Sequence, residues 1–261
     1  MDPLNLSLDE QRALAMRELS ECAQSVVLYR NLVRANPGAF TEPLASTLYK
    51  MAVLHRGLGS VSEAVGEYEE SLVHYRALFN SRPELYSDRV AKILINLAFL
   101  HRKSKRFDQA NSEVSEALVI YRELAKEESF VYTKRVASAL SELGLWYIDA
   151  NRFLESEVAW REVIALCQGY VFADPDGYEP QLARAKYWLG FICVSSDRNA
   201  EAATLFQESI ALCQRLAVKR PGVYENYVQR MQVLLGNIQQ KKSLESYIHS
   251  FTVASEQFPE V

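Results

Sequence analysis

The 261-residue sequence has few of the residues and motifs that build reactive sites or membrane spans. It contains four histidines, four cysteines and no CxxC pair, and its most apolar stretch, 93–100, is interrupted by Asn96. It also lacks a phosphate loop, a nucleophile elbow and an HExxH motif. We therefore predict a protein that is not an enzyme, holds no metal or cofactor and does not insert into a membrane.

The sequence has no excess of positive charge. It contains 29 lysines and arginines against 33 aspartates and glutamates, a net charge of −4, and its pI is about 5.7. Such a chain is not drawn to nucleic acid by its net charge. Residues 1–6 have no basic start followed by an apolar run, so we predict no signal peptide and a cytoplasmic location. Met1 ahead of a capped helix is the start expected of a complete protein.

The cysteines show no spacing typical of a metal site or a disulfide. Cys167 and Cys213 stand 46 residues apart, in the column that holds Tyr29, Tyr75 and Tyr121, so they replace packing residues. We expect all four cysteines to be small buried hydrophobic residues in a reducing compartment, namely Cys22, Cys167, Cys193 and Cys213.

What the sequence does contain is a repeat of 46 residues without a gap. An aromatic residue recurs at each step, and small residues recur in two further columns. The aromatic column is Phe40, Tyr86, Tyr132, Tyr178 and Tyr224, and the small columns are Ala52, Ala98, Gly144, Gly190, Gly236 and Ala64, Ala110, Ser156, Ala202. A fixed period of this length predicts a solenoid, in which each unit buries its apolar face against its neighbours.

Within one repeat the apolar residues follow helical spacing. Val90, Leu94, Leu97 and Ala98 lie on one face of a helix, and the segment 107–124 forms a second apolar face after the polar break at 103–105. Small residues where two helices cross let the helix axes approach closely. Each repeat is therefore predicted to be a hairpin of two antiparallel helices.

Three stretches together resemble the tetratricopeptide repeat. In this pattern a leucine is followed directly by a small residue, and an alanine lies twelve positions after the small residue. The three stretches are Asn96–His101, Arg106–Ala110 and Ala117–Ala125. The helices are longer than in the usual unit of 34 residues and are similar to those of long-period bacterial and kinesin-light-chain-like members. The resemblance covers about residues 16–241 and implies an all-α fold, a right-handed α-solenoid of about ten helices.

The register of the repeat predicts a single solenoid domain over 1–261. It has an N-terminal half-repeat or cap at 8–36, full repeats at 41–86, 87–132, 133–178 and 179–224, and an atypical C-terminal repeat at 225–261. A capping box at Ser7–Glu10 starts the first helix. The second helix of the last repeat is expected at about 244–257.

The resemblance also implies a binding groove. In a tetratricopeptide superhelix, the side of each first helix opposite its packing face lines the concave surface. The expected peptide-binding contacts are Tyr49, Val53, Lys92, Asn96, Phe99, Arg102, Leu145, Trp188 and Phe191. If they are exposed, the apolar members suit a peptide or a helix. The alternative is that curvature of the superhelix buries them against the preceding helix.

Basic and acidic residues are predicted to lie in different repeats along the same groove. Basic residues gather in the first two repeats, at Lys50, Arg56, Lys92, Arg102, Lys103, Lys105 and Arg106, whereas Glu142 and Asp149 occupy matching places in the third. This pattern favours an acidic segment or a free carboxylate as ligand of the amino-terminal half. A solvated basic face that keeps the protein soluble explains the pattern as well, and the sequence leaves both open.

The first helix has no partner before it in the chain. Its apolar residues Leu14, Met16, Val27 and Val33 are therefore expected to be only partly covered. A homodimer through this N-terminal helix, or docking of another chain, is one interpretation. A long helix that caps the end of the solenoid is the other.

Together these patterns predict a non-catalytic scaffold that binds a protein partner through a peptide or helical segment in the concave groove. Two alternatives remain open. One is a structural or assembly component that associates with itself. The other is a peptide-sensing regulatory module, which would need an output domain that the sequence does not offer.

Overall fold

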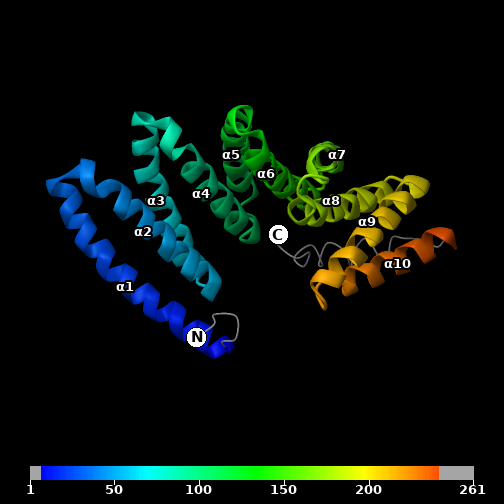
Figure 1. Ribbon diagram of the computed structural model, residues 1–261, viewed down its shortest axis with the longest axis horizontal. Coiled ribbons are helices and arrows are strands. Elements are labelled where there is room, and N and C mark those ends of the chain that lie inside the picture. Colours follow the sequence, from blue (N-terminus) through cyan, green and yellow to red (C-terminus); the bar gives the residue numbers. More distant parts are fainter. Residues whose placement is uncertain (1–6, 241–261) are drawn as a thin grey trace. The chain divides into compact units, whose positions relative to one another are not determined.

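The computed structural model describes residues 7–240 as helices in tandem, and these residues contain no β-strand (Figure 1). The helices are α1 (Leu8–Ala35), α2 (Pro37–Leu58), α3 (Val61–Ser81), α4 (Pro83–Lys103), α5 (Phe107–Glu127), α6 (Ser129–Asp149), α7 (Phe153–Tyr170), α8 (Pro175–Ser195), α9 (Asn199–Lys219) and α10 (Glu225–Gln239). The predicted all-α solenoid class is confirmed.

The chain divides into two compact units, and the boundary lies between Ile120 and Tyr121, inside α5. In unit 1, each of α1, α2 and α3 packs against the helix that follows it; in unit 2 the same holds for α6, α7, α8 and α9. The predicted helix at 244–257 lies outside the described residues. The repeat boundaries chosen from the sequence stay a prediction, since a tandem array can be divided at any point of its period.

The ends of the helices follow local sequence rules. The capping box at the start of α1 is confirmed, with the Glu10 amide donating to the Ser7 hydroxyl and the Glu10 carboxylate accepting from the Ser7 amide. The turns inside successive hairpins each contain one residue with positive φ, at 46-residue steps: Gly59 (φ 81°), Lys105 (φ 59°), Asn151 (φ 56°) and Asp197 (φ 60°). Glycine adopts this conformation freely, and Asn and Asp tolerate it better than Lys does.

The two helices of each hairpin in unit 2 approach closely at the small-residue column. A Cβ atom added to Gly144 would lie 2.6 Å from Cε2 of Trp160, and one added to Gly190 would lie 2.8 Å from Cε1 of Phe206. Both rings are fully buried. The hydroxyl of Ser156 donates to the Gly144 carbonyl at 2.8 Å across the same crossing. The glycines therefore create the space that these rings fill.

The aromatic column joins each hairpin to the helix before it. Tyr75 packs against Tyr86 with ring centroids 6.0 Å apart in unit 1, and Tyr121 packs against Tyr132 at 6.4 Å in unit 2. Cys167 occupies the next place of the Tyr75 and Tyr121 column, and the ring of nearby Tyr170 stacks on Tyr178 at 5.6 Å instead. The four cysteines are buried free thiols, as expected.

Ion pairs between successive second helices repeat with the same period. Arg30 of α1 meets Glu70 of α3 at 2.6 Å, Arg76 of α3 meets Glu116 of α5 at 2.6 Å, and Arg122 of α5 meets Glu162 of α7 at 2.7 Å. These side chains are partly exposed, so each pair contributes about 0–1 kcal/mol. Their main effect is to fix the register of neighbouring helices.

The close crossing in unit 2 predicts opposite effects of one substitution at two glycines. Gly190→Ala should destabilise the fold by about 1–3 kcal/mol, because its Cβ would overlap the Phe206 ring. Gly66→Ala is the matched control, since this α3 glycine has nothing within 4 Å, and it should stabilise the fold by about 0.5–1 kcal/mol. Urea unfolding followed by circular dichroism measures both. Equal effects at the two positions would contradict the account of the crossing.

Candidate functional site

The predicted contacts in unit 1 lie on α2 and α4. Tyr49 and Val53 come from α2, and the others come from α4: Lys92, Asn96, Phe99 and Arg102. All six are half-buried, so they are accessible in part and held by their neighbours. Tyr49 packs edge-on against the buried ring of Tyr68, with centroids 5.7 Å apart. The Asn96 amide donates to the Lys92 carbonyl at 2.9 Å, which fixes that side chain on its helix.

Phe99 is the centre of this surface. The guanidinium of Arg56, from α2, lies 5.9 Å from the Phe99 ring centroid, and Nζ of Lys103 lies 4.8 Å from it. Each cation–π contact at such a partly exposed site contributes about 0.5–1 kcal/mol. Arg56 and Lys103 were recognised from the sequence as charges, but their contact with Phe99 was not foreseen.

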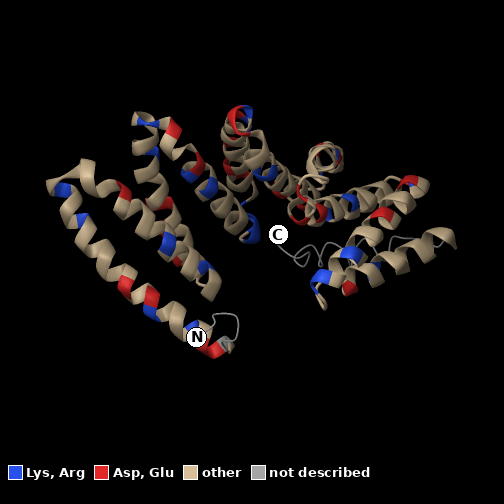
Figure 2. Cartoon of the chain, viewed as in Figure 1, with Lys and Arg blue, Asp and Glu red and all other residues tan. Residues whose placement is uncertain are grey.

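The basic residues of unit 1 differ in how far they are neutralised within the chain. Lys50 pairs with Glu18 of α1 at 3.1 Å, and Lys92 pairs with Asp88 of its own helix at 3.0 Å. The carboxyl end of α4 is strongly basic, and Figure 2 shows lysine and arginine gathered there. Positive charge is therefore concentrated beside Phe99 rather than spread evenly along the two helices.

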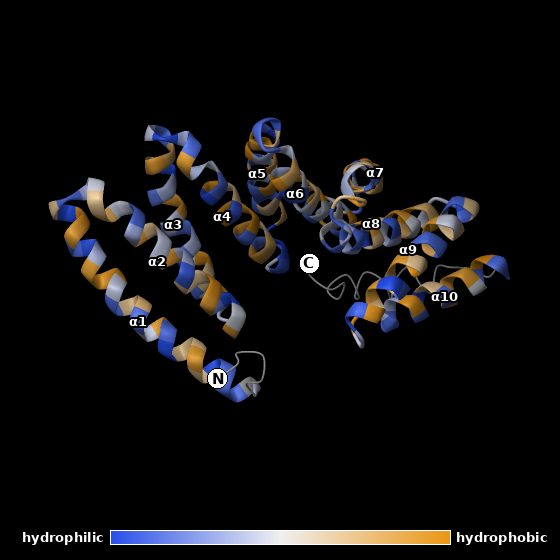
Figure 3. Cartoon of the chain, in the orientation of Figure 1, coloured by the Kyte–Doolittle hydropathy of each residue, from blue (hydrophilic) through white to orange (hydrophobic). Residues whose placement is uncertain are grey.

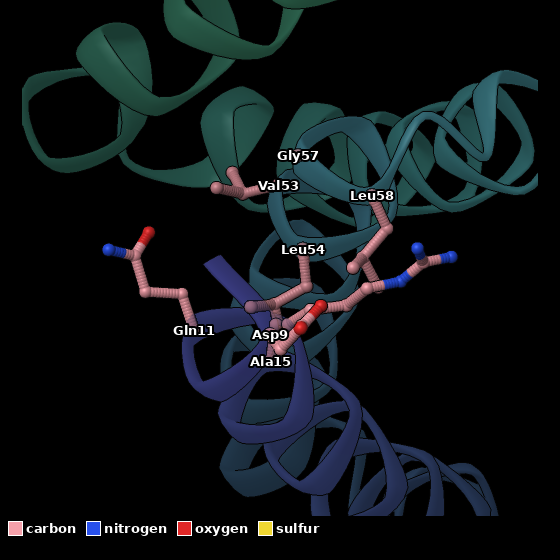
Figure 4. Close-up of a pocket in the computed structure, with 8 residues that line it drawn as sticks. Asp9, Gln11, Ala15, Val53, Leu54, Gly57 and Leu58 are labelled. Atoms are coloured by element: carbon pink, nitrogen blue, oxygen red, sulfur yellow. The ribbon is translucent and has the colours of Figure 1, made fainter. Parts of the chain in front are cut away.

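A cleft of about 480 Å³ lies between the amino-terminal part of α1 and the carboxyl-terminal part of α2 (Figure 4). Its lining is Asp9, Gln11, Arg12, Ala15, Val53, Leu54, Gly57 and Leu58. Val53 thus belongs both to the predicted contacts and to this cleft. Most of the lining was not predicted, because the sequence pattern does not show how the end of α1 lies on α2.

The three predicted contacts of unit 2 are buried. Leu145, Trp188 and Phe191 are 3%, 2% and 3% exposed. The expectation of an open apolar column therefore fails in this unit, since Trp188 packs against Phe191 and Tyr187, with ring centroids 6.0 and 5.1 Å apart. Figure 3 shows hydrophobic residues along α8, and this helix is buried on nearly all sides. Leu145, Trp188 and Phe191 are therefore core residues, which agrees with the alternative interpretation of the sequence.

One of the two acidic residues at the matching places of the third repeat, Glu142, has a partner within the chain. Glu142 of α6 pairs with Arg184 of α8 at 3.4 Å, and the two side chains are only 18% and 15% exposed. Glu142 and Arg184 therefore link neighbouring first helices within unit 2. This contact explains Glu142 without a ligand.

Two histidines of unit 1 pair with glutamates across their hairpins. Nδ1 of His55 lies 2.7 Å from Glu67, and Nδ1 of His101 lies 2.9 Å from Glu113. Burial raises the pKa of Glu113 to about 8, from an ordinary value of 4.5, and burial lowers the pKa of His101. Both pairs join the two helices of a hairpin.

The Glu113 pKa predicts a pH-dependent stability. Between pH 6.5 and 8 the folded chain keeps a proton on Glu113 that the unfolded chain has released, so stability falls as pH rises. The contribution of this proton to the free energy of unfolding is complete below about pH 4.5 and is lost as the pH passes about 8. Wild type should lose up to about 1 kcal/mol per pH unit in this window, and Glu113→Gln should remove that slope.

Urea unfolding between pH 6.5 and 8.5 measures the slope. Glu123→Gln is the matched control, because Glu123 is 65% exposed and pairs with Lys126. This control should keep the wild-type slope. An unchanged slope in Glu113→Gln would show that Glu113 is already ionised in the folded state.

Within residues 7–240, no helix is long and apolar enough to cross a bilayer, and no group of three or more His, Cys, Asp or Glu side chains could hold a metal ion.

Comparisons with known proteins agree with this architecture. Residues 136–169 match the family model of the tetratricopeptide repeat. A comparison with curated proteins finds no match. Among solved structures, BtubC (BKLC) from P. vanneervenii is 19% identical, with a TM-score of 0.62 over 92% of this chain and 87% of that one. MamA is 15% identical, with a TM-score of 0.51 over 81% of this chain and 98% of that one.

At these identities the structural likeness concerns the fold alone. The matched repeat covers α6 from Val136 onwards and nearly all of α7, which form one hairpin of unit 2. The fold is typical of protein-interaction scaffolds, and proteins built from this repeat are generally non-catalytic and bind protein partners. The chain therefore contains a match to the tetratricopeptide repeat at residues 136–169, within a solenoid of helical hairpins.

Proposed function

We propose that this protein is a non-catalytic scaffold that binds a peptide or helical segment of a protein partner on the α2–α4 surface of unit 1. The contacts are Tyr49, Val53, Lys92, Asn96, Phe99 and Arg102. Leu145, Trp188 and Phe191 stay outside this proposal because they are buried. The observation that carries the proposal is the half-buried Phe99 ring with Arg56 and Lys103 beside it.

The chemistry of this surface favours a particular ligand. Phe99 and Val53 offer apolar contact, and Arg56 and Lys103 offer positive charge at the edge of that contact. A segment with an aromatic or leucine side chain next to aspartate or glutamate matches both features. Apolar burial supplies most of the affinity, and the charges select the sequence and raise the association rate.

A second candidate function has its own observation. Leu14, Met16 and Val27 of α1 are 48%, 56% and 61% exposed, which favours association of this helix with another chain. A homodimer through α1 is compatible with ligand binding on α2 and α4, so this candidate adds to the scaffold role.

Selection of random 12-residue peptides displayed on phage, with the full chain as bait, should enrich peptides in which an apolar residue has acidic neighbours. Phe99→Ala should then raise the Kd of a selected peptide at least roughly tenfold, a loss of about 1.4 kcal/mol, because the ring at the centre of the surface is removed. Fluorescence polarisation of the labelled peptide measures this Kd.

Phe172→Ala is the matched control, since Phe172 is 95% exposed and lies in unit 2. This variant should bind the selected peptide as wild type does. Equal affinity of wild type and Phe99→Ala would reject the α2–α4 surface, and a loss in Phe172→Ala alone would move the site to unit 2. Circular dichroism confirms that each variant is folded.

A further inference from the structure

One exposed side of α1 carries an uncharged strip between two charged ends, of which Asp9 also lines the cleft against α2. At 3.6 residues per turn these residues share one side of the helix. We call it the α1 outer face, and it consists of Asp9, Ala13, Met16, Ser20, Ala23, Val27, Asn31 and Arg34. All of these residues are exposed except Ala23, which is half-buried. The face spans most of the 28 residues of α1.

Six residues of the α1 outer face form a twofold pattern, and the counterparts of Ala13 and Asn31 are Arg30 and Arg12, which lie beside the face. Met16 and Val27 lie at equal distances from a midpoint between residues 21 and 22, and so do Ser20 and Ala23. Asp9 and Arg34 are also equidistant from this midpoint. Reversal of the helix therefore places an apolar residue on an apolar residue, a small residue on a small residue and an acid on a base.

From this pattern we infer that α1 binds the α1 of a second copy of this chain, in antiparallel orientation. In a twofold interface each contact occurs twice, so Asp9 of each copy faces Arg34 of the other, and Met16 of each faces Val27 of the other. Ser20 and Ala23 at the centre let the two helix axes approach closely. A parallel arrangement would place Asp9 beside Asp9 and Arg34 beside Arg34, which charge repulsion disfavours.

The other charges of α1 do not oppose this pairing. Arg17 and Glu21, next to the outer face, pair with each other at 3.2 Å. Arg30 is held at 2.6 Å by Glu70 of its own chain. The flanking charges of Arg17, Glu21 and Arg30 are therefore already compensated within each copy.

Comparison with α3 shows what is particular to α1. Val73 of α3 stands 46 residues after Val27 and is 66% exposed, and Val119 of α5 is 62% exposed, so α1 shares an exposed valine at this place with these two helices. Ser62 and Glu69 of α3 correspond to Met16 and Ala23 of α1. Of the helices α1 and α3, only α1 has an uncharged strip with opposite charges at its two ends.

This inference deepens the second candidate function, association through α1, and rests on it, but it does not depend on ligand binding at the α2–α4 surface. The dimer would carry two α2–α4 surfaces, so a partner with two ligand segments would gain affinity from the second binding event without any new contact. The Phe99→Ala variant should keep the dimer, which separates failure of ligand binding from failure of dimer formation.

Sedimentation velocity of the full chain from about 1 to 100 μM should show a monomer–dimer equilibrium. Arg34→Asp should weaken the dimer roughly tenfold, since two acids would then meet at each end of the interface, and Asp9→Arg should weaken it similarly. The double variant Asp9→Arg/Arg34→Asp should restore the wild-type Kd to within about threefold. Rescue by the double variant separates pairing between copies from loss of folding.

Val27→Glu and Val73→Glu provide a matched pair of apolar-to-acid substitutions. Val27→Glu should abolish the dimer, and Val73→Glu should leave it unchanged. A wild-type chain that stays monomeric throughout the concentration range would overturn the inference. So would charge variants that are not rescued by the double exchange, or a dimer that Val73→Glu disrupts as strongly as Val27→Glu does.

Discussion

The fold depends on how closely the two helices of each hairpin approach at their crossing. Glycine at 144 and 190 leaves space that Trp160 and Phe206 fill, so the small residue and the ring opposite it form one packing unit. The second hairpin instead has Ala98 on its first helix and Val114 at the place that matches Trp160. In these three hairpins glycine stands opposite a large ring, and alanine stands opposite a smaller side chain.

This constraint decides which surfaces remain for function. The packing face of every first helix is committed to the hairpin, so a ligand can use only the opposite side. In unit 2 that side is also buried, because Trp188, Phe191 and Tyr187 pack together on α8. In unit 1 it is half-open, with Phe99 held between Arg56 and Lys103. The difference between the units directs the proposed binding to α2 and α4.

Periodicity predicted most of the fold and only part of the site. The 46-residue columns predicted the helical hairpins and their close crossings, and the local pattern at Ser7–Glu10 predicted the capping box of α1. Burial of Trp188 and Phe191 could not be predicted, since a helical wheel gives the direction of a side chain but not the distance to the next helix. The column of Arg30, Arg76 and Arg122 was visible in the sequence, but its ion-pair partners lie 40 positions further on and were not foreseen.

The most direct test of the central claim is hydrogen exchange of the full chain, read by mass spectrometry, with and without a saturating phage-selected peptide. Binding on the α2–α4 surface predicts slower amide exchange in peptides from 37–58 and 83–103, with exchange in α8 unchanged. Protection confined to α8, with α2 and α4 unaffected, would contradict the claim and place the ligand on the buried face of unit 2.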